Sequence, residues 1–137
     1  MKNITTTILA GILLISCSKN AAPIVPTNIT TEQSVVLQNV LAEFKTRGYY
    51  SEALESVSVV LVSREELAAY CETKDLTNGC ATERNIFIVD EVVVDFAYML
   101  IHELFHIALF HQTGDADAGH ATQVFPEEVI KVRNNLK

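Results

Sequence analysis

Positively charged residues are few in this chain. Ten lysines and arginines stand against 17 aspartates and glutamates, which gives a formal net charge of −7, and the basic residues form no run. Without a basic patch the chain has no electrostatic means of holding a phosphate backbone, so we expect no nucleic-acid partner. No stretch reaches the roughly 20 apolar residues of a membrane-spanning helix, because Asp95 interrupts the apolar region from Val92 to Ile101.

The sequence also lacks internal repeats and any sign of a second domain. Its 137 residues are 49% hydrophobic and 20% charged, which lies outside disordered and collagen-like compositions. We therefore expect one globular domain, present as a monomer.

The N-terminus has the composition of a targeting segment. A short positive start from Met1 to Asn3 precedes an apolar, threonine-rich stretch from Ile4 to Ile15, and Ser16 and Cys17 follow at once. The run Leu-Ile-Ser-Cys resembles the lipobox of bacterial lipoproteins, in which the cysteine receives a diacylglyceryl group and becomes the first residue of the mature chain. An ordinary secretory signal with an incidental cysteine and a short uncleaved anchor are the alternatives.

This resemblance divides the chain into three parts. It implies that residues 1–16 are a signal peptide and that Cys17 is lipidated. Residues 17–29, which are polar and contain two prolines, are expected to form a flexible tether, and residues 30–137 the domain. The implied location is the bacterial cell envelope, where the lipid holds the protein at the outer membrane, the periplasmic face or the cell surface.

The three cysteines fit this location. With Cys17 assigned to the lipid, Cys71 and Cys80 remain as a pair. An extracytoplasmic compartment favours a disulfide between them, and the turn-forming sequence Thr77-Asn78-Gly79 can bring the ends of the loop together. Two unpaired thiols are the alternative.

Hydrophobic periodicity and capping residues predict an α+β fold with a small sheet. Gln33 after Thr30, and Glu66 after Ser63, are typical of capping boxes, and Gly114 is a natural helix stop. The expected elements are a backing helix from about Thr31 to Arg47, a buried strand from Ser56 to Val62, a short helix from Ser63 to about Tyr70, a strand from Asn85 to Asp90, a long apolar helix that starts between Glu91 and Asp95 and ends near Gln112, and a final helix opened by Pro126.

The long helix contains the sequence His102-Glu103-Leu104-Phe105-His106. Histidines four residues apart lie one helical turn apart on nearly the same face, so both imidazoles can reach one metal ion while Glu103 projects beside them. All four histidines of the chain fall between His102 and His120. The alternative, a buried helix with ordinary core histidines, has to bear a desolvation cost of about a few kcal/mol.

A catalytic zinc takes a third protein ligand and leaves its fourth position to water. His120 is the preferred third ligand, because residues 112–119 supply a turn and a small-residue loop, and Gly119 lets the backbone approach closely. His111 lies about 140° around the helix from His106 and is expected at the surface. Other candidate ligands are Asp115, Asp117, Glu127 and Glu128.

The segment from His102 to Phe125 is similar to the SprT-like and small secreted zincins. In these proteins the HExxH motif, here residues 102–106, is followed after a short loop by a Gly-His or His-Gly step and then by a phenylalanine. The corresponding residues are Gly119-His120 and Phe125. The resemblance implies a minimal zincin-like domain that holds Zn²⁺ through His102, His106 and His120. Glu103 is then the general base that takes a proton from the water activated by zinc.

The expected function is a membrane-anchored zinc metallopeptidase acting on extracytoplasmic protein or peptide. A lipoprotein that binds zinc without turnover is the alternative, but Glu103 is not a ligand and favours the enzyme. Asp95 is expected to stabilise the helix dipole or, as the second possibility, to orient His102. Tyr98 is expected to pack beside His102 rather than act on substrate. In zincins an edge strand near the active-site helix pairs with extended substrate, and the resemblance makes the strand from Asn85 to Asp90 the candidate for this role.

Overall fold

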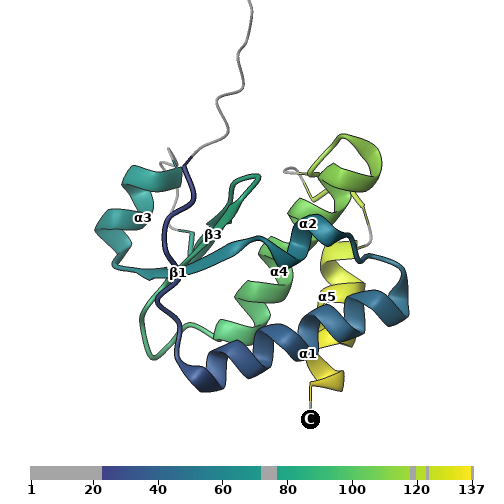
Figure 1. Ribbon diagram of the computed structural model, residues 1–137, viewed down its shortest axis with the longest axis horizontal. Helices are drawn as coiled ribbons and strands as arrows, with labels where there is room; N and C mark the ends of the chain where they lie inside the picture. The colour runs from purple at the N-terminus through teal and green to yellow at the C-terminus, as the bar shows by residue number, and fades with distance from the viewer. Residues whose placement is uncertain (1–22, 72–76, 118–119, 123, 137) are drawn as a thin grey trace, which may run out of the picture.

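The computed structural model describes residues 23–71, 77–117, 120–122 and 124–136. The predicted signal peptide and Cys17 therefore lie outside the described residues. Among the described residues, no helix combines the length and apolar character that a membrane crossing requires. The elements are α1 (Thr31–Arg47), α2 (Glu52–Glu55), β1 (Ser58–Val62), α3 (Arg64–Cys71), β2 (Gly79–Ala81), β3 (Asn85–Val89), α4 (Phe96–Thr113), the π-helical turn η1 (Val124–Glu128) and α5 (Val129–Asn135) (Figure 1).

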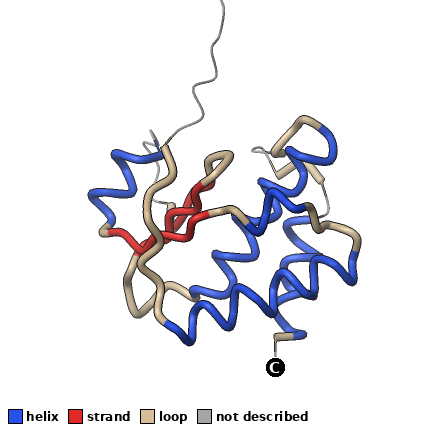
Figure 2. The backbone as a smooth tube through the Cα atoms, viewed as in Figure 1, coloured by secondary structure: helices blue, strands red, loops and turns tan. Residues whose placement is uncertain are grey.

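The prediction of an α+β fold with a small sheet is confirmed, but the strand near residues 85–90 does not lie at the edge of the sheet. Helices surround a single small sheet (Figure 2), whose order is β1-β3-β2, with β1 parallel and β2 antiparallel to β3. The prediction that residues 85–90 form an edge strand is therefore wrong: β3 is the central strand, ends at Val89 and is buried along its whole length. The edge next to it is β2, which the sequence did not indicate because its Gly-Cys-Ala run is short and has low β propensity.

The segment before α1 covers the other edge of the sheet. Residues 23–29 form no helix or strand, as expected of a tether, but their hydrogen bonds fix them to the domain. The Asn28 side-chain amide accepts from the Leu61 N–H at 2.7 Å and donates to the Leu61 carbonyl at 2.9 Å, as a neighbouring strand would. The Thr27 hydroxyl donates to the Val59 carbonyl at 2.6 Å. Because β1 is covered in this way, β2 is the edge of the sheet that has no neighbouring strand among the residues that the structure describes.

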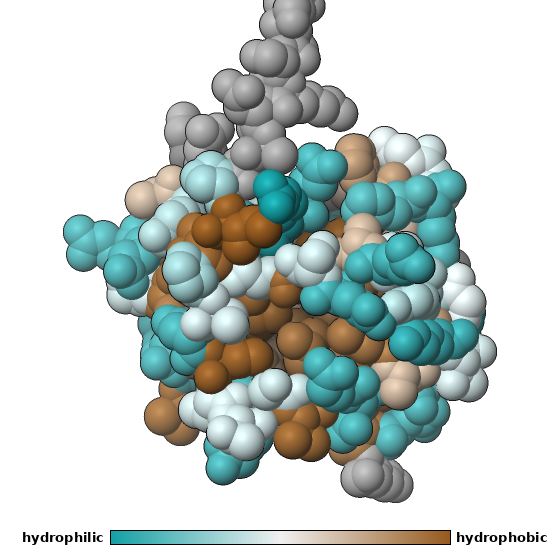
Figure 3. Space-filling view, viewed as in Figure 1, coloured by the Kyte–Doolittle hydropathy of each residue, from teal (hydrophilic) through white to brown (hydrophobic). Residues whose placement is uncertain are grey.

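The same segment borders an apolar hollow on the face drawn in Figure 3. The cavity there measures about 520 Å³ and lies between residues 24–31, the first turns of α1 and the start of β1; its apolar walls include Ile29, Leu37 and Val57. It lies apart from the histidines of α4, whose cavities have different walls.

Helix α4 is the central helix of the domain and contacts the sheet, α1 and α5. Leu100, Ile101 and Leu104 are completely buried. The Phe105 ring lies 4.5 Å from the ring of Phe44 on α1, measured between centroids. These contacts fix the rotation of α4 about its axis, so its polar side chains point in one set direction.

Most helix ends follow the capping residues. Both predicted capping boxes are present, Thr30 with Gln33 and Ser63 with Glu66, and Gly114 ends α4 in the left-handed conformation (φ 79°). Two boundaries differ from the prediction by two residues. The strand predicted from Ser56 begins at Ser58, because Ser56 closes the short helix α2, and the chain is already helical two residues before Pro126. A proline is tolerated anywhere in a first turn, because N–H groups there have no helical acceptor.

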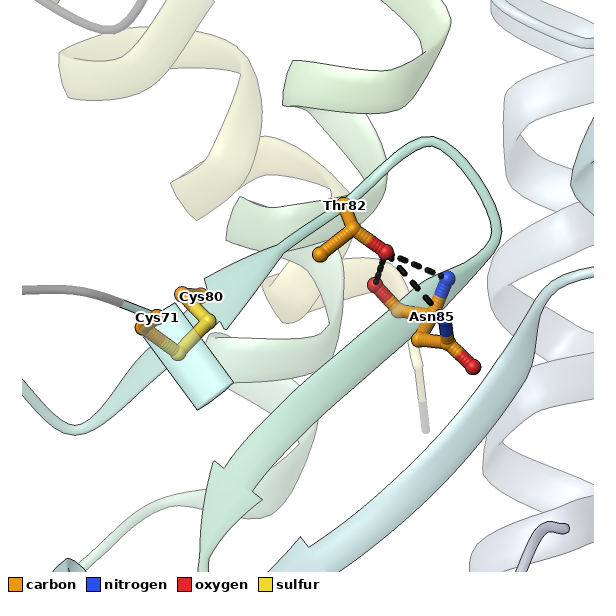
Figure 4. The surroundings of a disulfide bond; sticks show 4 residues. All are labelled: Cys71, Cys80, Thr82 and Asn85. Atoms are coloured by element: carbon orange, nitrogen blue, oxygen red, sulfur yellow. Dashed lines mark hydrogen bonds between the residues drawn. A yellow bond between two sulfur atoms is a disulfide. The ribbon is translucent and has the colours of Figure 1, made fainter. Parts of the chain in front are cut away.

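A disulfide joins Cys71, the last residue of α3, to Cys80 in the middle of β2, with the Cα atoms 6.1 Å apart (Figure 4). The turn after β2 is closed by Thr82 and Asn85, whose backbone groups bond at 2.8 Å. The edge strand β2 is therefore held at its centre by the disulfide and at its end by the turn.

A Cys71→Ser and Cys80→Ser double variant is expected to lose about 2–3 kcal/mol of unfolding free energy, since the bridge closes a loop of about ten residues in the unfolded chain. Urea denaturation measures the change, with Cys17→Ser as a control that leaves the pair intact. Equal unfolding free energies for the double variant and the parent protein would show that the bridge does not stabilise the domain.

Asp95 caps the N-terminus of α4. Its carboxylate accepts the Tyr98 N–H at 3.0 Å and pairs with Arg133 on α5 at 3.1 Å. Partial burial raises the pKa of Asp95, but the bonds from Tyr98 and Arg133 outweigh it and hold the pKa below its usual value. A lowered pKa means that the ionised carboxylate stabilises the fold above about pH 4, and that this contribution is lost as the pH falls through the folded-state pKa.

An Asp95→Ala variant is therefore expected to lose about 1 kcal/mol of unfolding free energy at pH 7. The difference from the parent protein should shrink at about pH 2, because the parent's carboxylate becomes protonated as the pH falls through its lowered folded-state pKa. Urea titrations at both pH values measure it, and Asp90→Ala removes a neighbouring exposed carboxylate as the control. A difference that does not change with pH would contradict the assignment to the ionised cap.

Candidate metal centre

The three histidines favoured as ligands come together in the structure. His102 and His106 lie one turn apart on α4, and their Nε2 atoms are 3.3 Å apart. His120, in the loop after α4, places its Nε2 atom 3.2 Å from that of His106. The candidate ligand atoms of all three lie within 4.8 Å of one another. The three imidazoles, called the histidine triad below, are close enough to bind one metal ion.

The orientation of His106 is fixed by the loop. Its Nδ1–H donates to the Ala116 carbonyl at 2.7 Å. A neutral imidazole that carries its proton on Nδ1 leaves the Nε2 lone pair free, and here Nε2 faces the other two rings. Burial lowers the pKa of His106, although the bond to Ala116 opposes the shift. The ring is thus held in the neutral form that a metal requires.

His102 is neutral for a related reason. Burial, together with the neighbouring rings of His106 and His120, lowers the pKa of His102 to about 4. Its Nδ1 atom is buried and meets no hydrogen-bond partner within the described residues. Asp95 does not supply that partner, because its carboxylate is bound to Tyr98 and Arg133. It lies at the N-terminus of α4, where a carboxylate stabilising the helix dipole was expected, and in addition caps the helix.

A network around Asp117 shapes the loop that carries His120. The buried Asp117 carboxylate accepts the Ala121 N–H at 2.8 Å, the Thr122 N–H at 2.9 Å and the Thr122 hydroxyl at 2.7 Å. The bonds from Thr122 hold the pKa of Asp117 below its usual value. Asp117 and His120 both adopt left-handed backbone conformations, with φ of 51° and 52°. Such conformations are unfavourable for non-glycine residues, and the hydrogen bonds of Asp117 offset that cost.

The ring of Phe125 packs against all three imidazoles of the histidine triad. Its buried ring lies 4.8 Å from the ring of His102, 4.4 Å from that of His106 and 4.4 Å from that of His120, between centroids. The side chain projects from the π-helical turn η1. In the sequence Phe125 was only part of a family resemblance, and its contact with all three imidazoles was not foreseen.

Glu103 lies against the edge strand and lines the same cavity as the histidines. Its side chain is buried, and burial raises its pKa to about 8. A Cβ atom on Gly79 would lie 3.0 Å from Met99 Cε, 3.1 Å from the Phe87 carbonyl oxygen and 3.2 Å from Glu103 Oε1. A side chain at this position would therefore crowd both α4 and β3, so the glycine favours the close approach of β2. The cavity measures about 350 Å³ and is walled by β2, α4 and the loop around Ala116.

The other candidate ligands have different roles in the structure. Asp117 organises the loop, and Asp115 accepts the Asp117 N–H at 2.8 Å. Glu127 and Glu128 pair with Lys131, and Glu128 also pairs with Arg47 at 3.1 Å. His111 is exposed, with its ring 5.9 Å from that of Phe110, and Gly119 lies outside the described residues.

Tyr98 lies beside the triad without entering it. Its ring centroid is 6.2 Å from that of His102, and the side chain is 38% exposed. This position agrees with the packing role expected for it.

Comparison of the chain with protein-family models, curated protein sequences and solved structures gives no match. What the site can do is therefore indicated by its own chemistry. Two neutral imidazoles on one helix and a third from a loop point at a common space, and a buried carboxyl group lies next to them.

An Asp117→Ala variant is expected to bind zinc about 10–100-fold more weakly, because His120 loses the network that holds its backbone in place. Competition with a chromophoric chelator measures the affinity. Glu127→Ala, which removes an exposed carboxylate from η1, is the control. An unchanged affinity in the Asp117 variant would mean that this network does not position a metal ligand.

Proposed function

We propose that this protein is a zinc metallopeptidase, a minimal zincin-like domain that cleaves protein or peptide substrates and is anchored to the cell envelope through lipid on Cys17. The observation that supports the proposal most strongly is the combination of the histidine triad with Glu103. A site that only stores metal has no use for a buried carboxyl group that is not one of its ligands.

The donor set suits zinc. Tetrahedral zinc with Zn–N distances of 2.0–2.1 Å places its nitrogen ligands about 3.3–3.4 Å apart. The Nε2 atom of His106 lies 3.3 Å from that of His102 and 3.2 Å from that of His120, and all three candidate ligand atoms lie within 4.8 Å of one another. Three protein ligands rather than four are typical of catalytic zinc, whose remaining position faces solvent or substrate. Here the triad borders an open cavity of about 350 Å³.

Zinc held by His102, His106 and His120 would supply a Lewis acid that polarises a peptide carbonyl and lowers the pKa of water. The chain contributes the proton transfer: Glu103 takes the proton of the attacking water and passes it to the nitrogen of the leaving amine. Burial raises the pKa of Glu103 to about 8, which keeps the group mostly protonated at neutral pH in the absence of metal. A cation held by the histidine triad would lower this pKa and leave the carboxylate as the base. His106 is kept in the ligating tautomer throughout by the Ala116 carbonyl.

In this proposal the substrate pairs with β2, and not with the strand near residues 85–90 that was expected to bind it. The Asn78 carbonyl accepts from Val89, and the Thr82 N–H donates to Asn85. Because bonding alternates along an antiparallel pair, Gly79 and Ala81 direct their peptide groups away from β3. Both residues line the cavity of the triad. An extended peptide can therefore add to β2 as a fourth strand, held mainly through its backbone, which predicts broad sequence tolerance.

Glu103→Gln in the zinc-loaded full chain is expected to reduce hydrolysis of a fluorescent unfolded protein by at least about 100-fold while leaving zinc affinity unchanged. His120→Ala should lose both hydrolysis and zinc binding, because it removes a ligand. His111→Ala, which replaces an exposed histidine on α4, should retain both. Chelation should abolish the activity of the parent protein.

Two results would contradict this proposal. A Glu103→Gln variant as active as its parent would exclude Glu103 as the base. A parent protein that binds zinc through His102, His106 and His120 but cleaves no peptide would support the non-catalytic zinc-binding lipoprotein instead.

A further inference from the structure

A second, smaller cavity adjoins the one that holds the triad. It measures about 140 Å³ and lies between the end of β2 with its following turn and the second half of α4. Most of its wall is apolar: Ala81 from β2, Ile107 and Phe110 from α4, and Ala116 from the loop. We call this cavity the side pocket.

The side pocket is continuous with the metal centre. Ala81, His106 and Ala116 line both cavities, and His106 is one of the three proposed metal ligands. Ile107 is 3% exposed and belongs to the main core, so this wall of the pocket is rigid. A molecule bound beside the triad can therefore extend one group into the side pocket without rearrangement of the fold.

The size of the side pocket limits its occupant. Apolar cavities of about 150 Å³ hold a single benzene-sized molecule, so the pocket has room for one medium-sized apolar side chain. Glu83 lies at its exposed turn, and a carboxylate there disfavours an acidic group.

We propose that the side pocket binds one aliphatic side chain of leucine size from a peptide paired with β2, and so selects the substrate residue next to the metal centre. The proposal rests on the proposed function. Successive side chains of an extended peptide alternate in direction. A peptide bonded to the outer edge of Gly79 and Ala81 therefore turns every second side chain toward α4, where the pocket opens beside Ala81.

Peptide binding by the zinc-loaded Glu103→Gln protein tests this proposal without turnover. The probes are fluorescein-labelled peptides Ala-Ala-X-Ala-Ala in which X is serine, leucine or tryptophan. The leucine peptide should bind about tenfold more tightly than the serine peptide, since burial of the side chain removes apolar surface from water. Ala81→Leu, which fills the pocket, should abolish this preference, whereas Ala68→Leu on the exposed face of α3 should keep it.

A second variant tests the side pocket even if Ala81→Leu does not fold. Phe110→Ala enlarges the pocket and should shift the preference from leucine toward tryptophan, with the fold of each variant checked by circular dichroism. Equal binding of all three peptides, no peptide binding at all, or the same preference in the Ala81 and Ala68 variants would overturn the proposal. Tight, Ala81-dependent binding of the leucine peptide by a parent protein that cleaves nothing would support the pocket and refute the proposed hydrolase.

Discussion

The constraint on which the rest of this site depends is the close approach of three imidazoles, whose candidate ligand atoms lie within 4.8 Å of one another. Neutral imidazoles this close together stabilise one another little, so other contacts must hold each ring in its position. The core contacts of α4 fix its two histidines, the Ala116 carbonyl fixes the tautomer of His106, and Phe125 supports all three rings. A single cation between the three rings would satisfy their lone pairs at once, which is why a metal is the natural occupant.

The small sheet matters to this site because of its free edge. Residues 23–29 cover β1, and β3 is enclosed between two neighbours, which leaves β2 to face the cavity. Its position is set from both sides, since the disulfide at Cys80 ties it to α3 and the glycine at position 79 lets it pass beside Glu103. The elements that stabilise the domain therefore also determine how far the edge strand lies from the triad.

Local signals predicted the parts of the fold and site that depend on neighbours in sequence. The spacing of His102 and His106, the cap at Asp95 and the stop at Gly114 all act within a few residues, and each is present. The position of β2 depends on α4, α3 and β3 together, so a three-residue run could not reveal it. The continuous apolar run of β3 is typical of a central strand, a signal that the expectation of an edge strand overlooked. The approach of His120 depends on left-handed backbone that Asp117 stabilises through bonds to Ala121 and Thr122. These bonds are local, but they follow no helical or strand periodicity, so the sequence pattern did not reveal them.

The coordination of zinc tests the central claim most directly. X-ray absorption at the zinc edge of the loaded full chain should show three imidazole nitrogens at about 2.0–2.1 Å and one oxygen from solvent. The same measurement on a His120→Ala protein should show one imidazole fewer. A spectrum of the parent protein with two imidazoles or fewer, or one unaffected by the loss of His120, would contradict the assignment of the histidine triad as a metal centre.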